Sequence, residues 1–285
     1  MNLYQVLVTM DTLPREIAGE IIQRLGDTPA QVLRMTCRYF AGCIPRRRAN
    51  LLMYGATHGL VELCELGLIR KNDKQYVGCA AAKNGHLDVL KWIKSFCDPS
   101  SDLFVNVCAG AASGGHLEIL KWAVENGCKY GAWTCAVAAS YGHLEILRWA
   151  VENGCEWDTQ TCSNAAENGH LEILKWAREN GCEWDKRTCA VAAENGHLEI
   201  LKWARENGCA WNRSTCSNAA ENGHLEILKW ARSNGCKWDE WTCILSARRG
   251  HLEVLVWAIE NGCPWNPKNV SELPAHIQEY CRALR

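Results

Sequence analysis

Two residue types with chemical potential, cysteine and histidine, recur at regular intervals along this chain of 285 residues. The chain has 18 cysteines, and most of them fall into two columns. The first column comprises Cys128, Cys155, Cys182, Cys209, Cys236 and Cys263, and the second comprises Cys108, Cys135, Cys162, Cys189, Cys216 and Cys243. A Gly-His pair recurs in the same way, at His86, His116, His143, His170, His197, His224 and His251. Thiols and imidazoles bind zinc, and thiols form disulfides, so a metal-binding or redox protein is one hypothesis.

The regular spacing argues against such chemistry. Equivalent residues of stacked helices lie about 8–10 Å apart. A disulfide needs Cα atoms within about 7 Å, and zinc needs ligands that converge within about 2.3 Å of one ion. We therefore expect reduced, buried thiols that act as small core residues, and we leave open a contact within a repeat, such as Cys155 with Cys162. The histidines are expected to pack and hydrogen-bond at helix starts.

Composition argues against several other classes of function. The 31 basic and 32 acidic residues give a net charge of −1, which provides no electrostatic basis for binding nucleic acid or an anionic membrane. No apolar run approaches the length of about 18 residues that a membrane span needs. Residues 1–10 carry no Lys or Arg, so we expect no secretory signal peptide. Phosphate loops, nucleophile elbows and zinc-protease motifs are missing from the sequence. We expect no catalytic residue, no metal and no cofactor, in a protein of the cytoplasm or, alternatively, the nucleus.

A repeat defines the elements that must position these residues. The spacing from His143 to His170 is 27 residues and then recurs, and the unit Gly154–Asn180 reads GCEWDTQTCSNAAENGHLEILKWAREN. A weaker copy lies around Gly59. Units this short, stacked many times, fit a helix–turn–helix pair with a short connector.

Each unit predicts two helices. In the second half, His170–Asn180, apolar residues cover about 220° of the helix circumference, which indicates burial on several sides. The first half, Thr161–Asn168, begins with a threonine able to act as N-cap and carries small alanines that allow close helix packing. Gly169 is expected to reverse the chain with positive φ, and Asn180-Gly181 to end the second helix.

Tryptophan forms two further columns, which we interpret as the core between repeats. Truncation of Trp176 to alanine is expected to cost about 3–5 kcal/mol. The columns are Trp92, Trp122, Trp149, Trp176, Trp203, Trp230 and Trp257, and Trp157, Trp184, Trp211, Trp238 and Trp265.

The segment AAENGHLEILKWARENG resembles the ankyrin repeat, whose usual unit has about 33 residues. Thr161, Cys162 and Ser163 take the last three positions of the family's Thr-Pro-Leu-His motif. The connector is about six residues shorter than in the family, so a tight loop is expected in place of a β-hairpin finger. The unit is similar to Trp- and Cys-rich arrays of giant viruses and some protists, which would place the protein in a host cytoplasm. The resemblance implies an all-α ankyrin-like solenoid over 49–285, of about eight repeats, with a C-terminal cap from about residue 266.

Positions that vary between repeats are the candidates for ligand binding. They lie in the connectors and in the first helices, on the side with which ankyrin arrays typically bind proteins. The varied positions of the first helices include Val137, Asn164, Val191, Asn218 and Leu245. The residues that we predict to bind an unidentified target protein are Trp133, Tyr141, Gln160, Arg187, Arg213, Trp241, Arg248 and Arg249.

Residues 1–48 form a separate helical unit in our interpretation. The stretch TLPREIAGEIIQRLGDTPAQVLRMTCRYFAGCIPRRR resembles an F-box, which begins with Leu-Pro and ends with a Leu-Arg…Cys-Arg…Phe run. The resemblance implies contacts to a Skp-type adaptor of a cullin ubiquitin ligase through Leu13, Pro14, Ile17, Ile21, Leu25 and Leu33. The alternative is a plain N-terminal cap, which a repeat array needs in any case.

Three hypotheses for function follow. The first is a substrate-recruiting ligase subunit, monomeric outside its complex, with the F-box on the adaptor and the array on the target. The second is an interaction scaffold that works without a ligase. The third is the metal-binding or redox protein suggested by the cysteines, which the spacing disfavours.

Overall fold

The computed structural model describes residues 74–95, 106–265 and 273–283. In these ranges the regular structure consists of 15 α-helices and no strand, as predicted. Among the described helices, none combines the length and apolar character of a membrane span. The F-box-like segment 1–48 lies outside these ranges. The same holds for the six residues predicted to contact an adaptor, which are Leu13, Pro14, Ile17, Ile21, Leu25 and Leu33.

The chain divides into two compact units, Met1–Leu103 and Phe104–Arg285. In the described part of the first unit, α6 (Lys74–Lys83) and α7 (Leu87–Ser95) form one helical pair. The chain turns between them at Gly85, which has a φ of 84°. Val77 of α6 and Leu90 of α7 are fully buried.

The second unit repeats such a pair six times along the described chain, from α8/α9 to α18/α19. The first helices are α8 (Val107–Gly114), α10 (Ala132–Ser140), α12 (Thr159–Glu167), α14 (Lys186–Glu194), α16 (Arg213–Glu221) and α18 (Glu240–Arg249). The second helices are α9 (Leu117–Glu125), α11 (Leu144–Glu152), α13 (Leu171–Glu179), α15 (Leu198–Glu206), α17 (Leu225–Ser233) and α19 (Leu252–Glu260).

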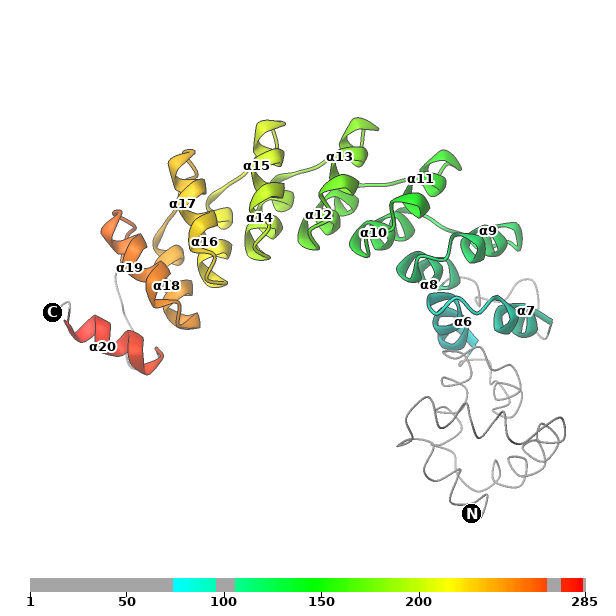
Figure 1. The fold of residues 1–285 in the computed structure, drawn as a ribbon, viewed down its shortest axis with the longest axis horizontal. Coiled ribbons are helices and arrows are strands. Elements are labelled where there is room, and N and C mark those ends of the chain that lie inside the picture. The colour runs from blue at the N-terminus through cyan, green and yellow to red at the C-terminus, as the bar shows by residue number, and fades with distance from the viewer. Residues whose placement is uncertain (1–73, 96–105, 266–272, 284–285) are drawn as a thin grey trace, which may run out of the picture. The chain divides into compact units, whose positions relative to one another are not determined.

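The two sets of helices form two layers. Successive first helices pack closely on one another, whereas contacts between successive second helices are sparse. Rows packed to different degrees give a curved stack, and within this unit the first helices lie along the inner side of the curve (Figure 1). Residues 153–158 join α11 to α12 without regular structure, which is the predicted tight loop.

The second helices owe their orientation to a narrow, fully buried stripe. In α13, Ile173, Leu174 and Ala177 are buried. Glu172 and Lys175 pair at 2.9 Å on the exposed side, as i,i+3 neighbours can. The helix is one residue shorter at each end than predicted, because His170 and Asn180 occupy the cap positions.

The first helices begin earlier than predicted. Thr161 is not the N-cap of α12, because the cap is Asp158, whose carboxylate accepts a hydrogen bond of 2.9 Å from the backbone N–H of Gln160. An ionised acceptor at this position satisfies a free N–H and matches the positive end of the helix dipole. Thr161 is instead buried within the first turn. Asp185, Asn212 and Asp239 cap the next three first helices in the same way.

Helix α20 (Ala275–Ala283) packs against the last pair. Its Ile277 and Cys281 are buried in one cluster with Cys243 and Leu255, so the last repeat does not expose its apolar face. This arrangement is what a terminal cap of a solenoid requires.

Candidate functional site

Recurrent histidines of the middle repeats form hydrogen bonds to the preceding repeat and are separated along the stack. His170 Nε2 lies 3.1 Å from the carbonyl oxygen of Ser140, the last residue of α10. A carbonyl can only accept, so Nε2 carries the hydrogen and donates. Each bond satisfies a C-terminal carbonyl of a first helix, which has no partner within its own helix. The predicted packing and hydrogen-bonding role is confirmed. The same contact recurs at His143, His197, His224 and, from α20, His276.

The glycine before each histidine serves the imidazole of the next repeat. Gly142 has a φ of +83°, and a Cβ placed on it would lie 2.9 Å from Cε1 of His170. Gly169 has a φ of +82° and receives His197 at the same distance of 2.9 Å. Glycine is therefore required before the histidine for two reasons. The turn has left-handed backbone geometry, and the imidazole of the next repeat packs where a side chain would stand.

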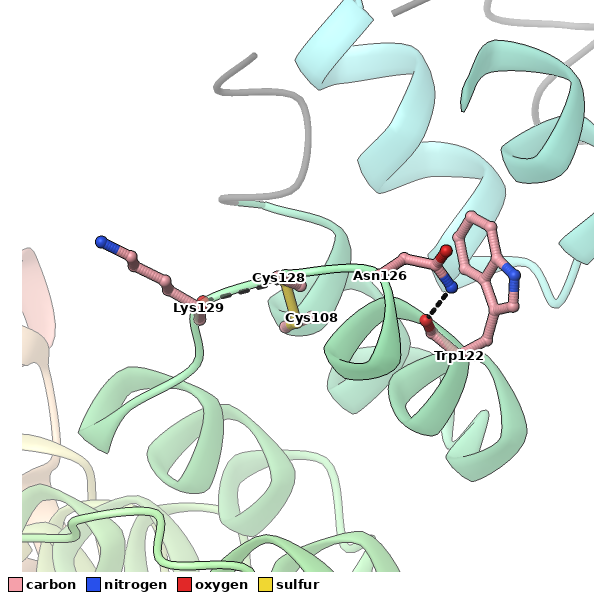
Figure 2. Close-up of a disulfide and its surroundings, with 5 residues drawn as sticks. All are labelled: Cys108, Trp122, Asn126, Cys128 and Lys129. Atoms are coloured by element: carbon pink, nitrogen blue, oxygen red, sulfur yellow. Dashed lines mark hydrogen bonds between the residues drawn. A yellow bond between two sulfur atoms is a disulfide. The ribbon is translucent and has the colours of Figure 1, made fainter. Parts of the chain in front are cut away.

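The cysteines, contrary to our expectation, meet in pairs. Cys108 and Cys128 form a disulfide with a Cα–Cα distance of 6.7 Å (Figure 2). In the next helical pair the thiol of Cys135, in α10, donates to Sγ of Cys155, after α11, at 2.9 Å. The contact of Cys155 with Cys162, which we had left open, is not the one formed, because Cys155 meets Cys135. The expectation that all thiols are reduced is wrong for Cys108 and Cys128.

The spacing argument failed because it compared equal positions of neighbouring repeats. The sulfur contacts join unlike columns, one cysteine in a first helix and one 20 residues later, after the second helix of the same pair. The constant separation of 20 residues was visible in the sequence and could have suggested the pairing. The pairs of the remaining repeats are Cys162 with Cys182, Cys189 with Cys209, Cys216 with Cys236 and Cys243 with Cys263.

The paired thiols differ in acidity. The pKa of Cys135 is raised mainly by the hydrogen bond that its thiol donates to Cys155 and, as a second cause, by burial. The hydrogen bond received from Cys135 lowers the pKa of Cys155, although burial opposes this effect. At Cys182 the pKa is lowered by the hydrogen bond from Cys162 and also by the nearby charge of Arg178. In the described part of the chain no group of three or more potential ligands could hold a metal ion.

The tryptophans of the two columns are half-buried, so they border the core between repeats that we expected them to form and are not enclosed by it. Trp184 and Trp203, of one repeat, meet edge to face with ring centroids 5.6 Å apart. Arg178 of the preceding repeat covers Trp184 at 4.3 Å and also donates to the carbonyl oxygen of Cys182. The edge-to-face contact thus holds each repeat together, and the cation–π contact joins successive repeats. Arg205 and Arg232 form the same two contacts in the following repeats. Because these arginines contact groups of the chain itself, the contacts support a structural role for the tryptophans.

The predicted target-binding residues are all exposed, and they lie on the first helices or, for Tyr141, at the C-cap of one. Trp133, Tyr141 and Trp241 are the three large apolar side chains described as exposed, at 70%, 51% and 49%. Gln160, Arg187, Arg213, Arg248 and Arg249 are exposed as well. The structure separates them into two rows. One row follows the helix N-termini, at Trp133, Gln160, Arg187, Arg213 and Trp241, and the other follows the C-termini, at Tyr141, Arg248 and Arg249.

The varied positions in the middle of the first helices do not belong to this surface. Val137 and Val191 are 8% exposed and pack between helices. Asn164 donates to the carbonyl oxygen of Ala136 at 3.2 Å. Variation at these positions therefore reflects packing between repeats. Asp158, in the connector before α12, is likewise structural, because it is the N-cap of that helix.

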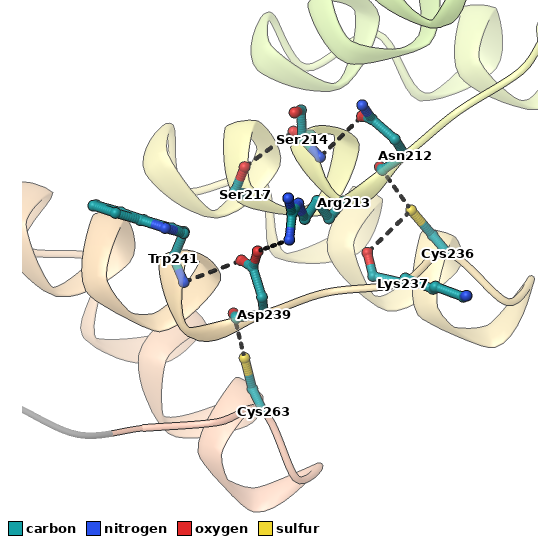
Figure 3. Close-up of polar contacts among 9 residues, drawn as sticks. All are labelled: Asn212, Arg213, Ser214, Ser217, Cys236, Lys237, Asp239, Trp241 and Cys263. Carbon is teal, nitrogen blue, oxygen red and sulfur yellow. Dashed lines mark hydrogen bonds and ion pairs between the residues drawn. The ribbon is translucent and has the colours of Figure 1, made fainter.

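Two of the candidate arginines are engaged within the array. Arg213 lies 3.2 Å from the carboxylate of Asp239, which also accepts the N–H of Trp241 (Figure 3). Arg249 pairs with Glu221 at 2.8 Å. Arg187 and Arg248 have no ion-pair partner among the residues that the structure describes. Their charges remain available on the surface.

The comparisons agree with this architecture. A family model described as ankyrin repeats (many copies) matches residues 135–178. That segment runs from α10 to α13, and the helical pairs on both sides continue it with the same positive-φ glycine turns. No curated protein matches the sequence. The family match and the stacked helical pairs together establish that this chain contains ankyrin repeats.

Proposed function

We propose that this chain is an adaptor that holds a target protein on the inner layer of its ankyrin array and recruits it to a cullin ubiquitin ligase. Ankyrin repeats suggest a role in protein–protein interaction. The observation that carries the proposal is the row at the second position of successive first helices. This row reads Trp133, Gln160, Arg187, Ser214 and Trp241. It changes at every repeat, while the residues that build the framework stay the same.

The chemistry of this row suits a protein partner. Aromatic rings and arginines are the residues most often found at the centres of protein interfaces. Stacked helices are spaced by about 8–10 Å, so the four steps from Trp133 to Trp241 cover roughly 30–40 Å. About ten residues of an extended polypeptide have this length. Trp133 and Trp241 would then anchor the ends of a bound segment, with the charge of Arg187 between them.

The recruitment step rests on the F-box-like segment. Leu13-Pro14, followed by spaced aliphatic residues, supports docking to a Skp-type adaptor. In this arrangement the chain performs no chemistry and raises the concentration of the target at the ligase. The second candidate function is a scaffold without a ligase, in which residues 1–48 cap the array.

The adaptor test uses the full chain and a purified Skp-type adaptor. Wild type should be retained on the immobilised adaptor, and the variant Leu13→Ala/Pro14→Ala should lose most of this binding. A variant of the array surface, Trp133→Ala/Trp241→Ala, is the matched control and should bind the adaptor as wild type does. No binding by wild type would leave the scaffold function in place.

The target test compares two faces of the array. Proteins captured by the full chain are quantified against the variant Trp133→Ala/Arg187→Ala/Trp241→Ala. The control replaces exposed glutamates of the second helices, Glu145, Glu172 and Glu199, with alanine. A partner that binds the inner layer disappears with the first variant and stays with the second. Equal capture by both variants would contradict the proposed surface.

A further inference from the structure

The cysteine pairs carry an inference that is independent of target binding. Six pairs occupy equivalent places in six successive repeats, and the first of them, Cys108–Cys128, is a disulfide. In that pair and in Cys135–Cys155 the two cysteines are 20 residues apart. In the other four pairs, from Cys162–Cys182 to Cys243–Cys263, the two thiols are close enough for the second cysteine to raise the pKa of the first.

The backbone presents the second cysteine of each pair in one fixed way. The N–H of Cys128 donates to the carbonyl oxygen of Ala123 at 2.9 Å, and the N–H of Cys155 donates to that of Ala150 at the same distance. The glycine before each of them has positive φ, 86° at Gly127 and 81° at Gly154. The hydrogen bond of the cysteine N–H recurs at Cys182, Cys209, Cys236 and Cys263. The backbone conformation and hydrogen bond of Cys128 thus recur at the second cysteine of the other pairs. We therefore expect those cysteines to be able to form the same disulfide as Cys128.

We propose that the five thiol pairs after Cys108–Cys128 are redox sites, each of which closes to a disulfide in exchange with a low-molecular-weight disulfide such as oxidised glutathione. The pairs are Cys135–Cys155, Cys162–Cys182, Cys189–Cys209, Cys216–Cys236 and Cys243–Cys263.

The exchange is balanced between the two reactants. The thiolate of Cys155 attacks one sulfur of oxidised glutathione, the glutathione S–S bond breaks, and one glutathione thiolate leaves and takes up a proton. The sulfur of Cys135 then loses its proton to water and attacks Sγ of the mixed disulfide, which releases the second glutathione. Two protein thiols are oxidised by two electrons, and one glutathione disulfide is reduced to two thiols.

The environment of each pair assigns the order of attack. Cys155 is 7% exposed and Cys135 is fully buried, so Cys155 is the member that a soluble disulfide can reach first. The lowered pKa of Cys155 favours the thiolate that this attack requires. Both thiols are buried, so exchange requires local opening of the turn after the second helix and is slow compared with that of a free thiol.

A closed pair would change the mechanics of the array. The bond between Cys135 and Cys155 joins the first helix of a pair to the residues after its second helix, so each helical pair would be linked internally. A repeat in a reduced solenoid depends on its neighbours for stability. An oxidised repeat loses chain entropy in its unfolded state and therefore resists opening on its own. The number of disulfides that link the array would therefore depend on the thiol–disulfide potential of the surroundings.

The test uses the full chain, reduced and then equilibrated in buffers with increasing ratios of oxidised to reduced glutathione. Free thiols are blocked by alkylation, and linked peptides are identified by mass spectrometry after trypsin digestion. The pair Cys189–Cys209 is the clearest reporter, because Lys202 and Arg205 lie between its members and trypsin separates them. We expect this linked peptide, and those of the other pairs, to appear with the loss of two hydrogen atoms per pair. The urea midpoint of unfolding should rise with the oxidised fraction.

Two variants separate pairing from general reactivity. Cys189→Ala should leave Cys209 as a mixed disulfide with glutathione, and the other four links should form as before. Cys281→Ala is the matched control, because Cys281 is a buried cysteine outside the pairs, and all five links should form. Circular dichroism of each reduced variant verifies that it folds. Ten thiols that stay alkylatable at the most oxidising ratio, or links between other cysteines, would overturn the proposal.

Discussion

The imidazole Nε2 of His197 lies 3.1 Å from the backbone carbonyl oxygen of Glu167, the last residue of the preceding first helix. The histidine begins the second helix of its own repeat and, through this bond, completes the C-terminus of a helix in the repeat before it. One side chain thus links local structure to stacking.

The glycine onto which the imidazole packs should be intolerant of any side chain. Gly142→Ala combines a φ of +83° with a Cβ only 2.9 Å from His170, while Gly154→Ala has a φ of +81° and no atom within 4 Å. The backbone term alone costs about 1–2 kcal/mol, so Gly154→Ala should lose about that much, and Gly142→Ala should lose more. Urea unfolding of both variants gives the difference. Equal losses would show that the imidazole moves away at no cost.

Helix α10 lacks the side-chain cap that the following first helices have. Its N-cap is Gly131, in extended conformation and with open space where a Cβ would stand. Gly131→Asp should therefore stabilise the protein by roughly 0.5–1 kcal/mol, through a new bond to an N–H and a less flexible unfolded chain. Asp185→Ala removes an existing cap bond of 2.8 Å and should cost about 1 kcal/mol. The thermal midpoint should shift in opposite directions in the two variants.

The buried threonine at the start of the first helices carries a hydroxyl that we expect to be dispensable. Oγ1 of Thr188 is buried and has no hydrogen-bond partner among the described residues. Thr188→Val keeps the shape of the side chain and removes the cost of burying a hydroxyl without a partner. The free energy of unfolding should therefore stay the same or rise by up to about 1 kcal/mol. The reverse exchange, Val254→Thr, introduces a hydroxyl at a site that is 2% exposed and should cost about 1–3 kcal/mol. Guanidinium unfolding distinguishes them, and a large loss in Thr188→Val would reveal a partner of the hydroxyl.

Leucine should contribute more to stability than tryptophan in the second helices. Leu174 is fully buried, so Leu174→Ala should cost about 3–5 kcal/mol through the cavity it leaves. Trp176 is half-buried against Trp157, with ring centroids 5.5 Å apart, and Trp176→Ala should cost clearly less than the roughly 3–5 kcal/mol of a buried tryptophan. Both values come from equilibrium urea unfolding. The reverse order would restore the tryptophans to the core.

The exposure of the candidate residues could be predicted from the sequence alone, because the exposure of a helix position follows from its place in a regular pattern. The eight candidate residues, among them Trp133 and Trp241, were chosen as varied positions, and all of them lie on the surface. The same criterion also selected Val137 and Val191, which are buried. Variation between repeats does not distinguish a surface from a packing contact that two residue types can satisfy.

The sequence by itself determined the helical pairs, their order and their turns, because these depend on residues close along the chain. Gly169 and Gly181 end helices through a backbone preference of their own, and the LEILKWARE pattern sets the buried stripe of α13. Tertiary structure decided which columns meet. Cys135 contacts Cys155, and His170 reaches Ser140, because of the rotation and offset with which helices stack. These quantities arise from packing summed over the whole interface, so no single repeat encodes them.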